Sequence, residues 1–262
     1  MDEDENHFYV KAGAGEGWHH FVLHCLAHQY AGVENLSLIP GNVGASPMQN
    51  IGAYGVEIKD VFHQLEAYHV QDKAVQSFNL QDCRFGYRES VFKNIYKGQF
   101  VILSVTYKLF KTPRFNTSYG AIQQELDNMG VKDLSIQAIS QAVINIRSSK
   151  LPDWKLIGYA GSFFKIPTIS NAQAQKLKET FPKMVSFPFG EHQTKLAAGW
   201  LIEQCGWKGY IKGDAGCYDK QALVLVNHGS AKGAEIYALS EEIVQSVQQK
   251  FGVTLEREVN II

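Results

Sequence analysis

Residues 39–55 form the feature that most limits how this chain can fold. The segment reads Ile-Pro-Gly-Asn-Val-Gly-Ala-Ser-Pro-Met-Gln-Asn-Ile-Gly-Ala-Tyr-Gly and contains no Lys, Arg, Asp or Glu. Its glycines tolerate positive φ and lack a Cβ, so backbone N–H groups can approach a flat or phosphorylated ligand closely. The segment has neither the Gly-Lys-Ser/Thr ending of a P-loop nor the Gly-x-Gly-x-x-Gly spacing of a dinucleotide fingerprint. The residues alone leave two interpretations open, a ligand-binding loop and a tight connection between strands.

Composition narrows the classes of function. The 262 residues have a net charge of −1 and 19% charged side chains, which is typical of a globular protein without a basic field for nucleic acid. No apolar run has the length of a membrane span, and the acidic residues 1–6 lack the apolar core of a signal peptide. The four cysteines are widely spaced, which favours reduced thiols over disulfides or a zinc site. We therefore expect a cytoplasmic protein with no nucleic-acid or membrane partner.

Strand and helix patterns interleave along the chain and predict an α+β or mixed α/β class. Strands are expected at 8–12, 61–70, 100–109, 222–227 and 254–259. Because side chains alternate along a strand, the third strand should place Val101, Leu103, Val105 and Leu109 on one face. Helices are expected at 18–29, 121–129, 135–148, 171–181 (capped by Ser170), 195–205 and 241–250. Glu241 and Glu242 should lie at the N-terminus of the last helix, where its dipole favours them.

The pair Leu151-Pro152 separates two regions of the chain. A proline disfavours helix in the residue before it, so the helix at 135–148 should end there. A chain of this length is long enough for two domains. We therefore place a domain boundary here and expect domains at 1–151 and 152–262.

Three sets of polar residues are candidates for chemistry. Arg88 can stabilise the charge that develops on a carboxylate or enolate, or it can simply pair with Glu89 on the surface. Ser162 precedes two phenylalanines and can be a proton donor or a turn residue, since no Gly-x-Ser-x-Gly elbow surrounds it. Glu256 and Glu258 share one face of the expected terminal strand, where one can serve an active site or both can be solvated.

Three histidines offer a different class of site. His20, His24 and His28 follow a four-residue spacing that stacks their side chains on one face of the predicted helix. Phe21 stands where a zincin would carry its glutamate. A metal site and a solvated histidine face are therefore the competing interpretations.

Taken in order, the motifs of the chain resemble those of the UDP-N-acetylenolpyruvoylglucosamine reductases over essentially its whole length. The resemblance is carried by Ile39-Pro-Gly-Asn-Val-Gly44, Gln49-Asn-Ile-Gly-Ala-Tyr-Gly55, Cys83-Arg-Phe-Gly-Tyr-Arg-Glu-Ser90, Arg147-Ser-Ser-Lys-Leu-Pro-Asp153, Ala160-Gly-Ser-Phe-Phe-Lys165, Ala198-Gly-Trp-Leu-Ile-Glu-Gln204 and Leu255-Glu-Arg-Glu-Val259. The loop that ends in Tyr119 resembles the tyrosine loop of the family's type I branch.

The resemblance implies an α+β fold in which a flavin domain of the vanillyl-alcohol-oxidase (PCMH) type precedes an α/β substrate-binding domain. It implies that NADPH reduces FAD and leaves, and that the enolpyruvyl ether of UDP-N-acetylglucosamine then enters the same site. Hydride would reach the enol carbon remote from the carboxylate, in a step of peptidoglycan precursor synthesis carried out by a monomer. The residues implied for FAD are Ile39, Pro40, Gly41, Gly44, Ala45, Ser46, Met48, Asn50, Gly52, Tyr54 and Ile102.

The resemblance also implies roles for single residues. Ser162 matches the family's proton donor, and Arg88 and Glu258 match the positions that stabilise or protonate the intermediate. Tyr119 and Lys150 match contacts to the substrate diphosphate, and Tyr87 is expected to bind substrate beside Arg88. A serine hydroxyl is a poor acid unless a partner replaces its proton, so a charged group should lie near it.

The chain departs from the family pattern in four places. The family begins with a further small domain, whose Gly-Ser-Asn loop grips the FAD diphosphate and has no counterpart here. Ile166 stands where the family has Asn, Asn260 replaces an Arg, and Ala45 replaces a small polar residue. The alternative expectation is therefore a truncated, catalytically impaired fragment that binds flavin or a nucleotide sugar.

Overall fold

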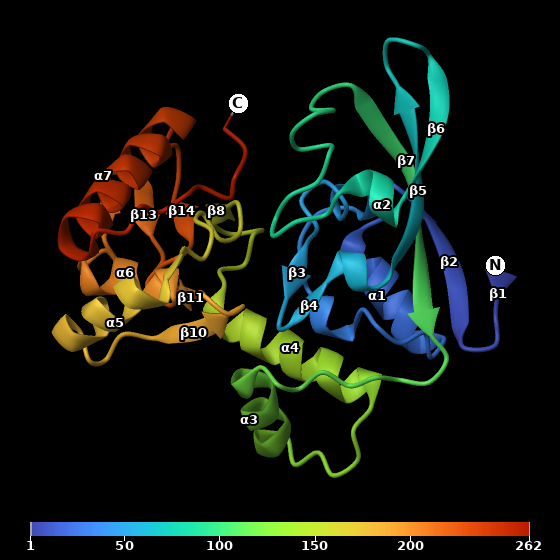
Figure 1. Ribbon diagram of the computed structural model, residues 1–262, viewed down its shortest axis with the longest axis horizontal. Helices are drawn as coiled ribbons and strands as arrows, with labels where there is room; N and C mark the ends of the chain where they lie inside the picture. Colours follow the sequence, from blue (N-terminus) through green and yellow to red (C-terminus); the bar gives the residue numbers. More distant parts are fainter. Residues whose placement is uncertain (1, 262) are drawn as a thin grey trace. The chain divides into compact units, whose positions relative to one another are not determined.

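The computed structural model describes residues 2–261, which form two compact units, one ending at Arg147 and one beginning at Ser148 (Figure 1). Each unit combines helices with antiparallel sheets, which confirms the α+β class. Within residues 2–261, no helix is long and apolar enough to cross a membrane.

A five-stranded antiparallel sheet forms the centre of the first unit, in the order β1-β2-β7-β5-β6 (Figure 1). Its strands are β1 (Asp2–Glu3), β2 (His7–Gly13), β5 (Phe62–His69), β6 (Ala74–Asn79) and β7 (Phe100–Phe110). The strands predicted near 8–12, 61–70 and 100–109 are confirmed. β6 was not predicted, because Phe78 is its one buried residue and the strand shows no apolar alternation.

This part of the chain also contains helices, 3₁₀ turns and a short strand pair. They are α1 (Trp18–Ala27), α2 (Leu80–Cys83), α3 (Gly120–Asn128), α4 (Ile136–Lys150), the strand pair β3 (Gly52–Ala53) and β4 (Val56–Glu57), and 3₁₀ turns at Glu34–Leu36, Val43–Ala45 and Ile58–Asp60. α4 buries Ile136, Ile139, Val143 and Ile146 at helical spacing and ends before Pro152, as predicted.

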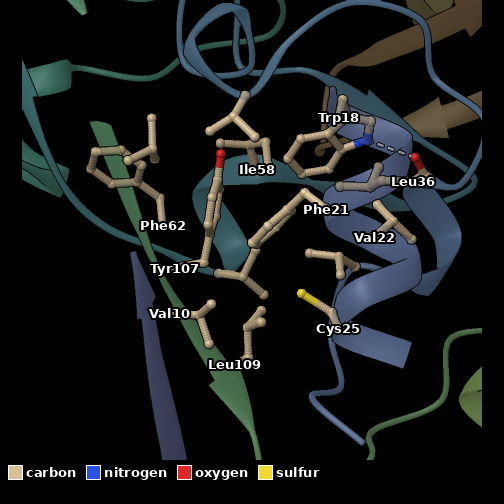
Figure 2. Close-up of a cluster of buried hydrophobic side chains, with 14 of the residues drawn as sticks. Val10, Trp18, Phe21, Val22, Cys25, Leu36, Ile58, Phe62, Tyr107 and Leu109 are labelled. Carbon is tan, nitrogen blue, oxygen red and sulfur yellow. Dashed lines mark hydrogen bonds between the residues drawn. The ribbon is translucent and has the colours of Figure 1, made fainter. Parts of the chain in front are cut away.

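The core of the first unit joins α1 to the sheet (Figure 2). Trp18, Phe21 and Tyr107 form an aromatic group in which the ring centroids lie 4.7–5.8 Å apart. The indole Nε1 of Trp18 donates to the Leu36 carbonyl oxygen at 2.8 Å, so the buried ring keeps its polar atom satisfied. The helix and the turn at Glu34–Leu36 are therefore fixed to one another inside the core.

A β-bulge in β7 changes which side chains face the core. β5 pairs with Ile102 and Ser104 but has no residue opposite Leu103. One extra residue reverses the alternation, so Val101 and Leu103 are 54% and 43% exposed while Ile102 packs against the core. The prediction that Val101 and Leu103 share a face with Val105 and Leu109 is therefore wrong.

The second unit contains two small antiparallel sheets and three helices. Its elements are β8 (Gly158–Tyr159), β9 (Thr168–Ser170), α5 (Asn171–Thr180), β10 (Ser186–Phe189), β11 (Gln193–Leu196), α6 (Ala198–Gln204), β12 (Ile211–Lys212), β13 (Ala215–Cys217), β14 (Leu225–Asn227) and α7 (Gly233–Phe251). Ser170 caps α5 as predicted, because its Oγ accepts from the Gln173 N–H at 3.2 Å. The helix predicted at 195–205 is shorter, since residues 193–196 pair with β10 as a strand.

α7 begins much earlier than predicted. It starts at Gly233, and the Glu235 carboxylate accepts from the Lys232 N–H at 2.8 Å as part of a capping box. Glu241 and Glu242 therefore lie in the middle of the helix and not at its N-terminus. Each pairs with a cation there, Glu242 with Lys212 at 2.7 Å.

Glu34 is a charged residue in the core of the first unit. It is only 2% exposed, and its Oε2 accepts from the Gly32 N–H at 2.6 Å. Burial disfavours the ionised form and raises the pKa of this carboxyl above its ordinary value. The folded chain therefore holds this proton more tightly than the unfolded chain does.

Replacing Glu34 by Gln should stabilise the protein at neutral and alkaline pH. With a raised folded-state pKa, the contribution of Glu34 to stability is largest below its unfolded pKa and falls as pH rises through the folded value. In the Glu34→Gln variant, the amide oxygen can still accept the Gly32 hydrogen bond, and the side chain carries no charge. Urea unfolding at pH 8 should give Glu34→Gln a larger free energy of unfolding than the wild type, and the difference should shrink as the pH is lowered toward 4. The exposed control Glu5→Gln should show no such trend, and a pH-independent gap would refute the prediction.

Candidate active site

The Gly-rich segment is held against the turn between β2 and α1. Val43 and Gly44 donate their N–H groups to the carbonyl oxygens of Glu16 and Ala14 at 2.8 and 3.0 Å. A Cβ added to Gly44 would lie 2.6 Å from the Cβ of Ala14, so only glycine permits this approach. Two short loops far apart in sequence are thereby packed backbone to backbone.

Three glycines of these loops present bare backbone at the surface. A Cβ added at Gly13, Gly15 or Gly41 would meet no atom within 4 Å, and Gly41 has φ +104°. We name these three residues the glycine cradle. Residues 39–55, which include Gly41 of the cradle, carry no charged side chain, whereas exposed Glu16 follows Gly15 in the other loop.

The predicted FAD contacts differ in exposure. Pro40, Gly41, Ala45 and Met48 are exposed, whereas Ile39, Gly44, Gly52, Tyr54 and Ile102 are partly buried. Ser46 and Asn50 are 1% and 0% exposed. The Ser46 hydroxyl is hydrogen-bonded to the Tyr107 hydroxyl at 2.8 Å, so its side chain is engaged inside the protein.

Asn50 joins the Gly-rich segment to the turn that carries Arg88. Its Nδ2 donates to the Gly86 carbonyl oxygen at 3.0 Å and to the Glu57 carboxylate at 3.2 Å. Its Oδ1 accepts from the Lys59 N–H at 3.0 Å. The side chain of this predicted FAD contact is therefore committed to the protein, which leaves its backbone for a ligand.

Arg88 occupies a strained turn of four residues. Gly86 and Glu89 exchange backbone hydrogen bonds at 3.0 and 3.3 Å, and Arg88 between them has φ +58°. Such a left-handed conformation is unfavourable for a residue with a Cβ and is concentrated at functional sites. The backbone conformation thus aims the guanidinium at the neighbouring Gly-rich segment.

The guanidinium of Arg88 is fixed by backbone, carboxylate and ring. Its Nη2 donates to the Gly52 carbonyl oxygen at 2.6 Å, and Nη1 lies 3.7 Å from the Glu57 carboxylate. Its Cζ lies 5.0 Å from the centroid of the Tyr87 ring. The structure therefore brings Arg88, Tyr87 and the Gly-rich segment together.

The loop that ends in Tyr119 is also attached to the Gly-rich segment. Asn35, which is 1% exposed, donates both protons of its amide, to the Tyr54 and Asn116 carbonyl oxygens at 3.0 and 2.9 Å. Asn116 in turn donates to the Gly55 carbonyl oxygen at 3.0 Å. The Tyr119 ring is 51% exposed and packs edge-on against Tyr54 at 5.4 Å.

In the second unit, Ser162 is displayed on a short, well-anchored segment. Gly161 has φ +79°, and the next residue, Ser162, is exposed. Phe163 and Phe164 are 5% and 1% exposed and pack edge-on at 5.4 Å in the core of the unit. Two buried rings thus hold the serine at the surface.

Glu258 lies on a segment that pairs with the serine segment. The Glu258 N–H donates to the Phe163 carbonyl oxygen at 2.9 Å, and the Lys165 N–H donates to the Glu256 carbonyl oxygen at 2.8 Å. The structure therefore brings the Ser162 and Glu258 segments side by side. The strand predicted at 254–259 is wrong, because a single bridge between Phe164 and Arg257 is the only ladder contact there among the described residues.

Lys165, three residues after Ser162 in the sequence, is a buried charged residue of the same segment. It is 8% exposed, and its Nζ lies 2.5 Å from the Glu256 carboxylate. Glu256 itself has a side chain that is 70% exposed, so it serves as the solvent-side partner of this lysine. Lys150 is exposed at the end of α4, Ile166 is partly buried, and Asn260 is exposed.

The histidine face does not gather a set of metal ligands. The rings of His24 and His28 lie 4.2 Å apart, and His28 stacks on Tyr30 at 5.5 Å. Across residues 2–261, no group of three or more His, Cys, Asp or Glu side chains is arranged to hold a metal ion. Nothing in this geometry favours the metal interpretation.

Sequence reasoning missed two residues that support the site. Glu57 contacts Arg88 and Asn50, and Arg257 fastens the segment that carries Glu258. Neither residue stands in a periodic pattern, since both belong to irregular or very short elements. The charge of Arg257 next to Glu258 was an available signal, whereas Glu57 stands between Val56 and Ile58, which are not candidate residues.

Comparison with known proteins agrees with these observations. Residues 1–75 match the family model described as FAD binding domain, and residues 153–262 match that of the UDP-N-acetylenolpyruvoylglucosamine reductase C-terminal domain. A flavin-binding domain followed by a reductase domain defines the chain as an FAD-dependent oxidoreductase.

The particular family follows from the relatives. The reductase of Amoebophilus asiaticus is 51% identical over 262 residues, which cover 100% of this chain and 77% of that protein. The reductase of Flavobacterium johnsoniae is 48% identical, with 100% and 78% covered. The chain belongs to the UDP-N-acetylenolpyruvoylglucosamine reductase family, as the resemblance indicated.

A solved structure shows the same fold. The UDP-N-acetylenolpyruvylglucosamine reductase from Thermus caldophilus matches with a TM-score of 0.64 at 23% identity. The match covers 96% of this chain and 71% of the other.

Glycine at position 88 should be better tolerated by the fold than alanine. A left-handed conformation costs about 1–2 kcal/mol for a residue with a Cβ, and the extra backbone entropy of glycine offsets about 0.5–1 kcal/mol of that. Urea unfolding should therefore find Arg88→Gly about 0.5–1 kcal/mol more stable than Arg88→Ala. The matched pair Glu89→Gly and Glu89→Ala, where φ is ordinary, should show the opposite order. The same order at both positions would contradict the strain argument.

Proposed function

We propose that this chain catalyses the NADPH-dependent, FAD-mediated reduction of UDP-N-acetylglucosamine enolpyruvate to UDP-N-acetylmuramate in peptidoglycan precursor synthesis. The observation that carries the proposal is the Arg88 turn, whose strained backbone fixes a guanidinium beside the glycine-rich segment. The family to which the chain belongs supplies the identity of the substrate. The two units then correspond to a flavin domain and a substrate domain.

The residues of the first unit fit a bound FAD. The glycine cradle offers backbone that a ligand can approach without meeting a Cβ, and the neighbouring segment is uncharged. Exposed Pro40, Gly41, Ala45 and Met48 would contact the cofactor directly, with Ile39, Gly44, Gly52, Tyr54 and Ile102 beside them. When bound, the flavin supplies the redox chemistry, by taking electrons from NADPH and giving hydride to the enolpyruvyl double bond.

Arg88 would stabilise the negative charge that forms on the substrate. Hydride addition to the methylene carbon leaves charge on the α-carbon and the carboxylate. A guanidinium that is already held by Gly52 and Glu57 needs little reorganisation to meet that charge. Its planar fork also matches a carboxylate better than lysine would. Tyr87, whose ring lies under the guanidinium, would line the same part of the substrate site.

Ser162 would donate a proton to the α-carbon, which completes the reduction. The proton leaves the Ser162 hydroxyl and forms the new C–H bond, so a second group must restore it. Glu258, on the segment hydrogen-bonded to that of Ser162, is the group proposed to stabilise or re-protonate this site. Buried Lys165, on the same segment and paired with Glu256, is the cation proposed to stabilise an anion that forms there.

Tyr119 and Lys150 would bind the substrate diphosphate. The Tyr119 ring is 51% exposed on a loop that Asn35 and Asn116 fix in place. Lys150 is exposed and cationic at the end of α4. A phenol donor and an ammonium group both suit phosphate oxygens.

We also propose that the enzyme acts as a monomer.

Substitution of the three proposed catalytic residues should abolish turnover without unfolding the protein. Arg88→Ala, Ser162→Ala and Glu258→Gln should each lower kcat about 100-fold or more, the range found for charge-stabilising and acid–base groups. The measurement is NADPH oxidation that depends on UDP-N-acetylglucosamine enolpyruvate, with flavin absorbance recorded for each variant.

Two exposed residues serve as controls, Ser77→Ala on β6 and Glu191→Gln, and both should keep wild-type rates. Full activity in any of the three catalytic variants would remove that residue from the mechanism. A chain that binds FAD but never consumes NADPH with substrate would instead be a binding fragment.

A methyl group at Gly15 should weaken FAD binding without disturbing the fold. A Cβ at Gly15 meets no protein atom within 4 Å, and the residue has no positive φ, so Gly15→Ala should fold normally. In the glycine cradle this methyl group would lie where we propose that FAD approaches the backbone. Flavin fluorescence titration should show a dissociation constant for FAD that is about tenfold larger than that of the wild type. This corresponds to a loss of ~1.4 kcal/mol in binding free energy. Gly233→Ala, equally open but in the second unit, is the control and should bind FAD as the wild type does.

A further inference from the structure

Arg257 makes three contacts with one face of α7. Its Nε donates to the Ser240 hydroxyl at 2.8 Å, and its Nη2 donates to the Glu241 carboxylate at 2.6 Å. Its Cζ lies 4.5 Å from the centroid of the Tyr237 ring. Ser240 and Glu241 lie one helical turn beyond Tyr237, so a single guanidinium spans the whole patch.

The partners of Arg257 are themselves fixed. Ser240 is 0% exposed, and its hydroxyl donates to the Tyr237 carbonyl oxygen at 2.6 Å, which leaves oxygen lone pairs to accept from Arg257. Hydrogen bonds from Tyr237 and then Arg257 lower the pKa of the Glu241 carboxyl, so it stays charged at neutral pH. The arginine is therefore held by a rigid helix in a charge-assisted hydrogen bond.

The position of Arg257 in the chain links this contact to Glu258. Arg257 is the residue that bridges to Phe164, and the two flanking hydrogen bonds join Glu256 and Glu258 to the Ser162 segment. The segment beyond α7 has no regular ladder in the described chain apart from this bridge. Its direction is set by this bridge together with side-chain contacts, which include the Lys165–Glu256 ion pair at 2.5 Å and the contacts of Arg257 with α7.

We propose that Arg257 is a positioning residue that fixes Glu258 beside Ser162 by clamping the C-terminal segment onto α7. The inference rests on the proposed function, because Glu258 must act in turnover for its position to matter. Loss of the clamp removes the contacts of Arg257 with α7 and leaves the bridge and the Lys165–Glu256 ion pair to orient the segment. Misplacement of a reacting group by about 1 Å costs up to about 100-fold in rate, so the effect should appear in kcat more than in KM.

The test is a double-mutant cycle between positions 257 and 258. Arg257→Ala should lower kcat about tenfold or more with little change in KM, and Arg257→Lys should recover part of the loss by keeping the charge. In the Glu258→Gln background, Arg257→Ala should change kcat by less than about twofold, because the group it positions is already gone. Lys212→Ala removes another ion pair to α7, with Glu242 at 2.7 Å, and should leave kcat unchanged.

Hydrogen exchange gives a readout that does not need turnover. The amides of Lys165 and Glu258 bond across the bridge, so Arg257→Ala should speed their exchange about tenfold or more while Lys212→Ala should not. Unchanged exchange in Arg257→Ala overturns the clamp whatever the activity. An equal loss of kcat in both backgrounds also overturns it, because the arginine then acts independently of Glu258. Full activity of Glu258→Gln would overturn the proposed role of Glu258 and this inference with it, whereas full activity of Arg257→Ala alone overturns only the inference.

Discussion

The side-chain amide of Asn50 is the interaction on which the site in the first unit depends. It is fully buried, and its three hydrogen bonds join two other stretches of chain, the Arg88 turn through the Gly86 carbonyl oxygen and residues 57–59 through the Glu57 carboxylate and the Lys59 N–H, all within 3.2 Å. A buried polar group that loses its partner costs about 1–3 kcal/mol, so displacing any one of these stretches is penalised by the amide itself. Arg88 completes the arrangement through its hydrogen bond to the Gly52 carbonyl oxygen. The glycine-rich segment and the Arg88 turn therefore define each other's position.

Local patterns were sufficient to predict the elements that bury one face. α1 and α4 place apolar residues at helical spacing, and Pro152 ends α4 as its chemistry requires. The bulge in β7 could not be predicted, because Ile102 and Leu103 are both apolar and the alternation looks the same in either register. The start of α7 was missed for a different reason. A glycine such as Gly233 is typical of a position where a helix is interrupted. Here the capping box between Lys232 and Glu235 allows the helix to begin at this glycine.

Part of the site could be predicted from the sequence. The residues that local sequence marks were predictable, whereas those fixed by contacts between distant parts of the chain were not. Arg88 and Ser162 stand among glycines and aromatic residues whose types already suggest a constrained turn, and the family resemblance assigned their roles. Arg257 was not predictable, because its partners lie about one helix away in sequence and its own segment has no period. The resemblance assigned Asn50 to the cofactor, yet the structure commits its amide to the protein. Residue type indicated that these positions matter, but only tertiary contacts show what each side chain touches.

The two units hold their proposed catalytic groups by different physical means, and this has consequences for how each tolerates change. In the first unit the backbone carries the constraint: Arg88 adopts a left-handed φ, and Gly44 lies where any Cβ would collide with Ala14. In the second unit side chains carry it, through buried phenylalanines behind Ser162 and an arginine clamp beside Glu258. Arg88 has a φ that its side chain disfavours, and at this position its guanidinium is held close to the backbone of the Gly-rich segment. Such a conflict between local preference and structure is expected where a fold loses some stability to build a functional site. The fold of the first unit is therefore sensitive to a Cβ at Gly44, and that of the second unit to the loss of its anchoring side chains.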